Sequence, residues 1–431
     1  MFESMRKFFT TVLFFILVAS PLVAQDNLVY WVHGLNDNRS TLEKDQVWYV
    51  YKYTLTKTDN RGTSIQWEST SSLATAADTL NAYISREVSN PGKAIVFGHS
   101  AGGLVARQAA KTSGGKIRAV ITAGTPNSGA PIITSLKNGS IDKLAVKGLT
   151  TIGAAISASL IAYDGSNILR KAFSAILGAE TFFMTLLGDV FGVVYIDINK
   201  GHYLRKQSVK DMDPDLSKNS FLAGLNASAP TTPIINIYGN EDEKQLVRLS
   251  GTLRHKSEVD SYLNVRDSTF DDEAMSVYNN VIANCAEYKA KHQEIANMTQ
   301  TCSQLLPKLS LTAATNSVAA NAWSSAIRYL QYDIHDEWDN IIGATHTESI
   351  QEWHQFLFIR WFTFKYVTVY EDSDGFIPNR RSMMKESLGP KTLNREVRGV
   401  NHLEMNSHPN MRKMLNRIYR GELGDEFNPE H

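Results

Sequence analysis

The chain has 431 residues, which is enough for one large domain with insertions or for two domains. Hydrophobic residues make up 43% and charged residues 20% of the chain, an ordinary composition for a globular protein. Lys plus Arg and Asp plus Glu number 44 each, so the chain has no net basic charge that would attract nucleic acid. We therefore expect no nucleic-acid partner.

The N-terminus has the three parts of a secretory signal peptide. Arg6 and Lys7 precede a charge-free apolar run over residues 8–19, and Ala24 offers a small residue for cleavage. The apolar run is too short to span a bilayer comfortably. We predict that residues 1–24 are a signal peptide and that the protein is exported to the periplasm, the outer surface or the medium.

The first strand after this segment is expected at residues 28–32, and His33-Gly34-Leu35 follow it directly. A glycine after a buried strand lets the backbone turn and aim N–H groups at a neighbouring reaction centre. In acyl transfer, each such donor to the oxyanion contributes on the order of 3 kcal/mol. We assign a candidate oxyanion hole to the backbone N–H groups of Leu35 and Ala101. The alternative is an ordinary turn with a structural His33.

Strands and helices then alternate along the chain. Aromatic and β-branched residues predict a strand over residues 48–56, and amphipathic spacing predicts a helix over 71–88. A strand at 93–97, a helix at 104–110 and a strand at 117–123 follow. This alternation predicts an α/β fold, with a doubly wound, mostly parallel sheet covered by helices on both faces.

Ser100 lies on the turn between the strand at 93–97 and the helix at 104–110. Gly98 and Gly102 flank it at minus two and plus two, where larger side chains would collide with the neighbouring strand and helix. Such a turn lifts the hydroxyl above the sheet edge, near the positive end of the helix dipole. Gly-x-Ser-x-Gly in this context predicts a nucleophilic serine, and Ala101 is the residue that follows it.

Three motifs together resemble those of α/β-hydrolase lipases and esterases, in particular triacylglycerol lipases and the deacylase of glycosylphosphatidylinositol anchors. The matching segments are residues 33–35, 98–103 and 124–130, which keep the family's order and spacing over 28–131. Residues 220–226, before a predicted strand at 233–239, are a further patch. The resemblance implies an α/β-hydrolase fold, with a serine, an acid and a histidine in that chain order and no cofactor.

The triad acid is assigned to Asp374. It follows a predicted strand at 365–370, and the Asp-Gly-Phe-Ile-Pro run that it begins resembles the family's acid loop. Asp372 and Glu371 are neighbouring alternatives. Asp242 is the main rival, because it follows the strand at 233–239.

The triad base is assigned to His402, which comes at the end of a predicted strand at 396–400. Loops at the carboxyl ends of parallel strands bring functional groups over a doubly wound sheet. The Asn-His-Leu-Glu-Met run around His402 is also similar to that of the family. His408, in a Ser-His-Pro loop farther from the strand end, is the alternative.

Two long insertions divide the predicted core. The expected organisation is core over 25–131, an apolar helical lid or cap over 132–228, a core strand in 229–243, a second helical insertion over 244–360, and core again over 361–431. An apolar lid would contact lipid surfaces and cover fatty acyl chains. Asp333, His335 and Asp336 in the second insertion are too loosely spaced to predict a metal site.

Cys285 and Cys302 are the only cysteines. In an exported protein an even number of cysteines favours a disulfide, which here would close a local hairpin around a polar helical stretch. A loop of this size would contribute about 3 kcal/mol to stability.

Together these patterns predict an exported serine hydrolase that cleaves carboxylic esters of lipids through Ser100, His402 and Asp374. An acyltransferase, a thioesterase or a peptidase would use the same residues. A lipid-binding protein on an inactive hydrolase scaffold is the alternative outside the enzymes.

Overall fold

The structure is a computed structural model. It describes residues 28–35, 62–68, 70–88, 92, 94–162, 204–241, 244–249, 252, 269–302, 308–356, 358–406 and 408–429. The predicted signal peptide, the predicted strand at 48–56, part of the predicted lid (163–203) and Asp242 lie outside the described residues.

A six-stranded sheet forms the core, and every neighbouring pair of its strands is parallel. In spatial order the strands are β2 (Gly62–Ile65), β1 (Leu28–Val32), β3 (Ala94–His99), β4 (Ile117–Ala123), β5 (Ile234–Asn240) and β8 (Thr392–Arg398). The sheet confirms the predicted α/β class. It also explains why β1, β3, β4 and β5 read as short apolar runs: parallel strands are buried on both faces.

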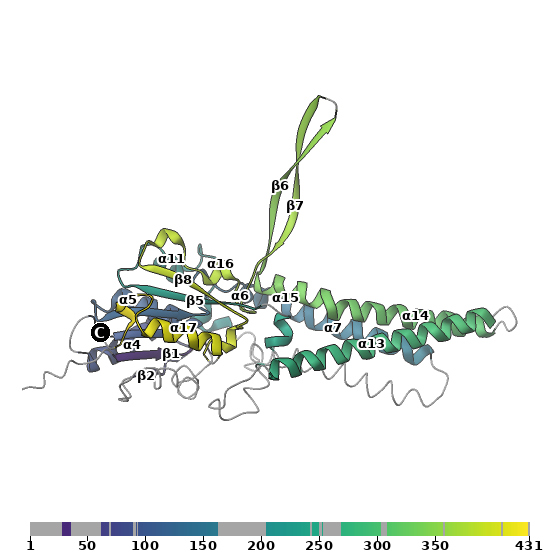
Figure 1. Ribbon diagram of the computed structural model, residues 1–431, viewed down its shortest axis with the longest axis horizontal. Helices are drawn as coiled ribbons and strands as arrows, with labels where there is room; N and C mark the ends of the chain where they lie inside the picture. Colours follow the sequence, from purple (N-terminus) through teal and green to yellow (C-terminus); the bar gives the residue numbers. More distant parts are fainter. Residues whose placement is uncertain are drawn as a thin grey trace, which may run out of the picture.

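Alternate side chains of each strand feed two separate apolar layers. On β1, Tyr30 and Val32 join one cluster, whereas Val29 and Trp31 join the other. The first layer packs against α4 (Leu73–Glu87) and α5 (Ala101–Thr112), and the second packs against α17 (Pro409–Tyr419). Figure 1 shows these helices around the sheet.

Three long helices form an arm that extends from the core (Figure 1). They are α7 (Ser140–Ala162), α13 (Thr269–Cys302) and α14 (Lys308–Arg328). Helix α14 packs along both α7 and α13. The arm therefore joins a helix of the first predicted insertion to helices of the second, so the two insertions are one structural unit in this part of the chain.

Helix α7 is the one helix within the described ranges that is long and apolar enough to cross a membrane, with a mean hydropathy of 1.6 in its best window. Only 28% of that window is buried. Val146, Leu160 and Ile161 are among its exposed side chains.

The predicted disulfide is wrong. Cys285 is a free, buried cysteine, and it lies on the same continuous helix, α13, as Cys302. At a rise of 1.5 Å per residue the two positions are about 25 Å apart along the helix axis, whereas a disulfide needs Cα atoms within about 7 Å. The segment between the cysteines is the interior of a helix and not the turn of a hairpin.

The chain leaves the arm through a π-helical turn (Tyr329–Asp333) and α15 (Ile334–Ile342), and then forms an antiparallel hairpin. Strands β6 (Thr345–Phe356) and β7 (Ile359–Tyr370) pair only with each other, and the hairpin projects away from the core (Figure 1). The predicted strand at 365–370 is the end of β7, so the core does not resume at residue 361 as expected. It resumes after Tyr370.

The remaining short elements lie around the core. They are α6 (Pro131–Lys137), α10 (Gln207–Lys210), α11 (Ser220–Leu225), α16 (Asn379–Ser382), and 3₁₀ turns at Glu386–Leu388, His402–Glu404 and Asp425–Phe427.

Candidate active site

Ser100 lies between the end of β3 and the start of α5, with backbone angles φ 52° and ψ −126°. It is the one non-glycine residue with a positive φ in the part of the chain that the structure describes. A Cβ at Gly98 would collide with the backbone of Gly102, and one at Gly102 with the carbonyls of Val32 and His33. The flanking glycines are thus required by the tight approach of strand, turn and helix, as the sequence indicated.

His402 reaches Ser100 from the loop after β8. Its Nε2 accepts a hydrogen bond from the Ser100 hydroxyl at 3.0 Å, and its Nδ1 donates to Asp374 Oδ2 at 2.8 Å. The His402 ring is largely buried, whereas Ser100 is partly exposed. One side of the serine hydroxyl is therefore fixed by the imidazole while the residue keeps access to solvent.

Asp374 is only 1% exposed and is held from both ends. Its Oδ1 accepts from the backbone N–H groups of Phe376 and Ile377 at 3.0 and 2.7 Å. Its own backbone carbonyl accepts from the His402 N–H at 2.7 Å. These bonds fix the carboxylate so that Oδ2 points at the imidazole.

The alternative acids and base lie elsewhere. Asp372 accepts from the Asn240 amide at 2.9 Å, and Glu371 pairs with Arg380. His408 is the N-cap of α17, where its Nδ1 accepts from the Asn410 N–H at 3.1 Å. Among the described candidates, the structure brings together Ser100, His402 and Asp374.

The turn at His33-Gly34-Leu35 lies directly beside Ser100, since a Cβ on Gly34 would be 3.1 Å from the Ser100 Cβ. His33 is fully buried, donates from Nδ1 to the Gly34 carbonyl at 2.8 Å and stacks on Trp67. It therefore shapes the turn. Ala101 is the first residue of α5, and N–H groups in the first turn of a helix have no intrahelical partner.

A buried ion network supports the loop that carries His402, and sequence analysis did not find it. Arg248 donates to Glu241 at 2.9 Å and to Glu404 at 3.0 Å, and all three side chains are buried. Asn401 caps the turn at its N-terminus, and Glu404 in return accepts a hydrogen bond from the Asn401 N–H. The Asn-x-x-Glu spacing of this capping box is the one signal in the sequence that marks the turn.

His99 and Gly124 also contact the histidine. His99 Nε2 donates to the His402 backbone carbonyl at 3.0 Å. Gly124 has φ 57°, and a Cβ there would lie 3.1 Å from His402 Nδ1 and 3.2 Å from Asp374 Oδ2. Both residues belong to the family-like segments 98–103 and 124–130, but their contacts depend on how β3, β4 and the loop that carries His402 come together.

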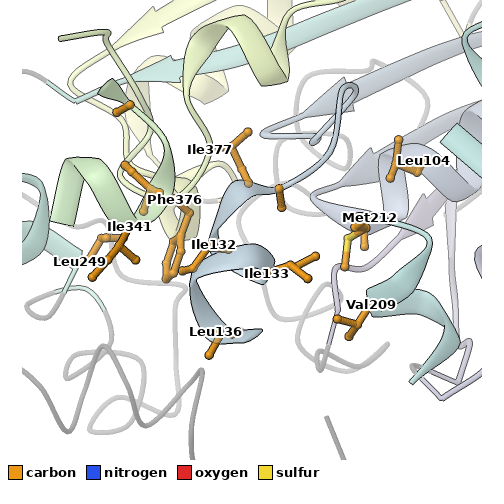
Figure 2. Close-up of a cluster of buried hydrophobic side chains, with 14 of the residues drawn as sticks. Leu104, Ile132, Ile133, Leu136, Val209, Met212, Leu249, Ile341, Phe376 and Ile377 are labelled. Atoms are coloured by element: carbon orange, nitrogen blue, oxygen red, sulfur yellow. The ribbon is translucent and has the colours of Figure 1, made fainter. Parts of the chain in front are cut away.

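An apolar cluster flanks the acid loop. Figure 2 shows Phe376 of that loop beside Ile132 of α6, with Leu249 and Ile341 on the other side of Phe376, and Ile377 belongs to the same buried cluster. The Phe376 ring also meets the His402 ring edge-to-face at 5.5 Å. The acid loop is therefore anchored by apolar packing as well as by hydrogen bonds.

Within the described residues, no group of three or more His, Cys, Asp or Glu side chains converges as a metal site would. Of the residues weighed earlier, Asp333 pairs with Arg328 and His335 meets Tyr278 edge-to-face. Burial, with a smaller contribution from Lys244, lowers the pKa of His335 to about 3, so its imidazole is neutral near pH 7.

The six parallel strands, the serine on the turn after β3 and the histidine after β8 define an α/β-hydrolase fold, which confirms the predicted fold class. Residues 23–146 match the family model described as the PGAP1-like alpha/beta domain, and that part of the chain is similar to this family. A search of curated protein sequences finds no match.

Solved structures with this kind of fold resemble the chain distantly. A lipase of Bacillus licheniformis is 13% identical with a TM-score of 0.32, covering 55% of this chain and 76% of its own. Est816, an N-acyl homoserine lactone degrading enzyme, is 14% identical with a TM-score of 0.28, covering 50% and 75%. An epoxide hydrolase of Bacillus megaterium is 14% identical with a TM-score of 0.23, covering 51% and 78%. The fold assignment rests on the strand order and the site.

Proposed function

We propose that the protein is a carboxylic ester hydrolase that uses Ser100 as nucleophile, His402 as general base and acid, and Asp374 to orient the imidazole. The observation that carries the proposal is the hydrogen-bonded chain from the Ser100 hydroxyl through His402 to Asp374. Three separate loops at the carboxyl edge of the sheet supply its members. Such an arrangement is the means by which a weak serine nucleophile is activated.

In the proposed mechanism His402 Nε2 takes the hydroxyl proton while Ser100 Oγ bonds to the ester carbonyl carbon. The N–H groups of Leu35 and Ala101 stabilise the resulting oxyanion. His402 then protonates the leaving alcohol as the carbon–oxygen bond breaks. His402 then takes a proton from water, whose oxygen bonds to the acyl carbon. The bond between that carbon and Ser100 Oγ breaks, and the imidazolium returns the proton to Ser100 Oγ, which frees the acid and the serine.

We propose that the substrates are lipid esters and that the protein is exported. The apolar, exposed side chains of α7 support lipid contact by the predicted lid region, and the motif resemblance supports an ester of a fatty acid. Export is supported by the pattern of residues 1–24.

The test combines a fluorophosphonate probe with a series of p-nitrophenyl esters of increasing acyl length, assayed with and without dispersed lipid. We expect the wild-type protein to be labelled and to hydrolyse the esters, with higher activity on long chains when lipid is present. Ser100→Ala should abolish labelling, and Asp374→Asn should lower kcat about 10⁴-fold. Asp372→Asn is the matched control and should keep wild-type activity.

Retention of labelling in folded Ser100→Ala would refute the nucleophile assignment. Product analysis with an added alcohol acceptor separates hydrolysis from acyl transfer. An equal loss of hydrolytic activity in the Asp372→Asn and Asp374→Asn variants would refute the assignment of Asp374 as the triad acid.

A further inference from the structure

The free end of the β6–β7 hairpin exposes a concentration of apolar side chains. We refer to residues 353–355 and 358–362 as the hairpin tip. Phe358 at the turn is 99% exposed, Ile359 67% and Trp353 65%, and Trp361 and Phe362 are also exposed. Large apolar side chains exposed together mark an interaction site.

These side chains cover both faces of the ribbon. In the strand register, Trp353 is opposite Phe362 on one face, and His354 is opposite Trp361 on the other. The rings of each pair touch, with centroids 5.4 and 5.6 Å apart. A groove on a protein would cover one face of a ribbon, whereas a bilayer surrounds an inserted tip on all sides.

Residue type changes along the hairpin in the order of a membrane interface. Phe358 and Ile359 come first, then Arg360 opposite Gln355, then the two tryptophans. Counted from the turn, the first carboxylate is that of Glu352, about 13 Å along the strand from the pair nearest the turn, Phe356 and Ile359. Membrane proteins use the same order: they place apolar side chains in the hydrocarbon, and Trp and cationic side chains at the level of the headgroups.

The charges favour anionic lipid. Residues 353–363 contain Arg360 and no Asp or Glu. The Arg360 side chain is exposed, whereas Lys365, opposite Ile350, lies farther from the turn than Glu352 does. Arg360 complements lipid phosphates, whereas a second copy docked at the same level would bring two like charges together.

Hydrogen bonding limits how deep the tip can go. A two-stranded ribbon has unpaired N–H and C=O groups along both outer edges, and these are costly to bury in hydrocarbon. Insertion of the turn and the first strand pairs corresponds to a depth of about 5–10 Å, which is the depth reached by other interfacial segments.

We infer that the hairpin tip inserts into the surface of a lipid bilayer that contains anionic lipid and tethers the protein there. The hairpin leaves and rejoins the core beside the acid loop, where the Glu371 N–H donates to the Ala344 carbonyl at 2.8 Å. The tether therefore arises at the edge of the sheet that carries Ser100, His402 and Asp374. The inference does not depend on the proposed hydrolysis.

The test is flotation of the full-length protein with vesicles of phosphatidylcholine alone or of an equal mixture of phosphatidylcholine and phosphatidylglycerol. All variants carry Ser100→Ala, so that hydrolysis cannot alter the vesicles. We expect the parent protein to float with the mixed vesicles. Phe358→Ser with Ile359→Ser should lower the partition coefficient at least about tenfold. Arg360→Gln should lower it about fivefold on mixed vesicles and little on phosphatidylcholine.

The matched control is Leu311→Ser with Val318→Ser, which removes two exposed apolar side chains from α14 and should leave vesicle binding unchanged. Circular dichroism and Tm establish that each variant is folded. Equal binding by the tip variant and its parent, or no binding by the parent, would overturn the inference. So would a dimer in lipid-free solution that the tip variant converts to monomers, because the tip would then join two copies of the chain.

Discussion

Gly124 lies against the hydrogen bond between His402 and Asp374, and a Cβ at this position would come within 3.2 Å of atoms of both side chains. Its φ of 57° is also a conformation that L side chains rarely adopt. Glycine is therefore needed here for two reasons: it allows the turn after β4, and it leaves room for the imidazole.

Gly124→Ala should lower kcat/KM of ester hydrolysis about tenfold, because the new methyl group displaces the imidazole or the carboxylate by a few tenths of an ångström. Gly114→Ala is the matched control, since it has φ 63° and open space around its Cβ position. Both variants should lose about 1 kcal/mol of stability from backbone strain, and only the first should lose activity. Equal kinetics in the two variants would show that the contact at Gly124 is not critical.

Asp339 gives a pH dependence of stability. Burial, with a smaller contribution from the neighbouring Asp336, raises its pKa to about 6. A raised carboxyl pKa means that the folded state binds the proton more tightly than the unfolded state does. Its stabilising contribution is therefore full below about pH 3.8 and is lost as the pH rises to about 6.

Asp339→Asn should raise the free energy of unfolding by about 1–3 kcal/mol at pH 8, because the buried charge is removed. The gain should shrink as the pH falls below 6 and vanish near 3.8. Urea titrations at several pH values measure it, with the exposed Asp78→Asn as the control. A pH-independent gain would mean that the effect does not come from ionisation.

At this scale the sequence pointed to residues close to the ends of strands, and their roles in catalysis stay a prediction. Ser100, His402 and Asp374 each follow a strand or precede a glycine, and local patterns reveal such positions. Arg248 and Glu241 had no such signal. Arg248 contacts Glu404 across more than 150 residues of chain and also holds Glu241, and both contacts depend on tertiary packing.

At the scale of elements, helix α13 determines whether the cysteines can form a disulfide and how reactive Cys285 is. Burial raises the pKa of the Cys285 thiol to about 11, so it is a poor nucleophile at neutral pH. Its position in a continuous helix keeps it away from Cys302.

Reductant should therefore leave the Tm unchanged, because no disulfide is present to break. Iodoacetamide should modify Cys285 only after unfolding, which mass spectrometry of the modified peptides measures. A fall in Tm with dithiothreitol would contradict the helical arrangement.

The arm has a polar cluster at its centre. Ser159 of α7 accepts from the Trp323 Nε1–H at 2.7 Å and lies 3.0 Å from His292 Nε2, while His292 Nδ1 is 2.7 Å from Asn316 Oδ1. All four residues are buried, so the cluster joins the three helices in one register.

Ser159→Ala should cost about 1–3 kcal/mol of stability, because Trp323 loses its acceptor in a buried site. Ser157→Ala, on the exposed side of the same helix, is the control and should have little effect. Thermal unfolding measures both. An equal effect of the two substitutions would mean that the cluster does not hold the helices together.

Element prediction succeeded where burial alone determines the pattern. The strands at 28–32 and 117–123 have the predicted bounds. Strand β2 was missed because its four residues, Gly62–Ile65, carry almost no apolar signal. Strand β7 was assigned to the wrong sheet, since a strand pattern does not name its partner.

At the scale of the whole molecule, the hairpin is an appendage of the core. Its strands pair only with each other, and the Ala344–Glu371 backbone bond closes its base. We therefore expect the core to fold without it.

Replacing residues 346–369 by a short Gly-Ser turn should leave hydrolysis of soluble esters within about twofold of wild type, because every group of the site remains. Vesicle flotation should be lost. Kinetics on a short-chain p-nitrophenyl ester and flotation measure the two properties separately. Loss of soluble activity in the folded variant would mean that the hairpin positions the acid loop.

Strands β5 and β8 are neighbours in the sheet, but the chain must complete residues 241–391 between them. Ring-closure entropy rises only with the logarithm of this length, so the long detour is thermodynamically tolerable. During synthesis, however, one edge of β5 stays unpaired until β8 has been made, and an unpaired apolar edge promotes aggregation. The segment that finally covers this edge also delivers His402. A truncated chain that ends before Thr392 would thus lack the proposed base and be prone to aggregate. The sheet is completed by the same segment of chain that places His402 beside Ser100.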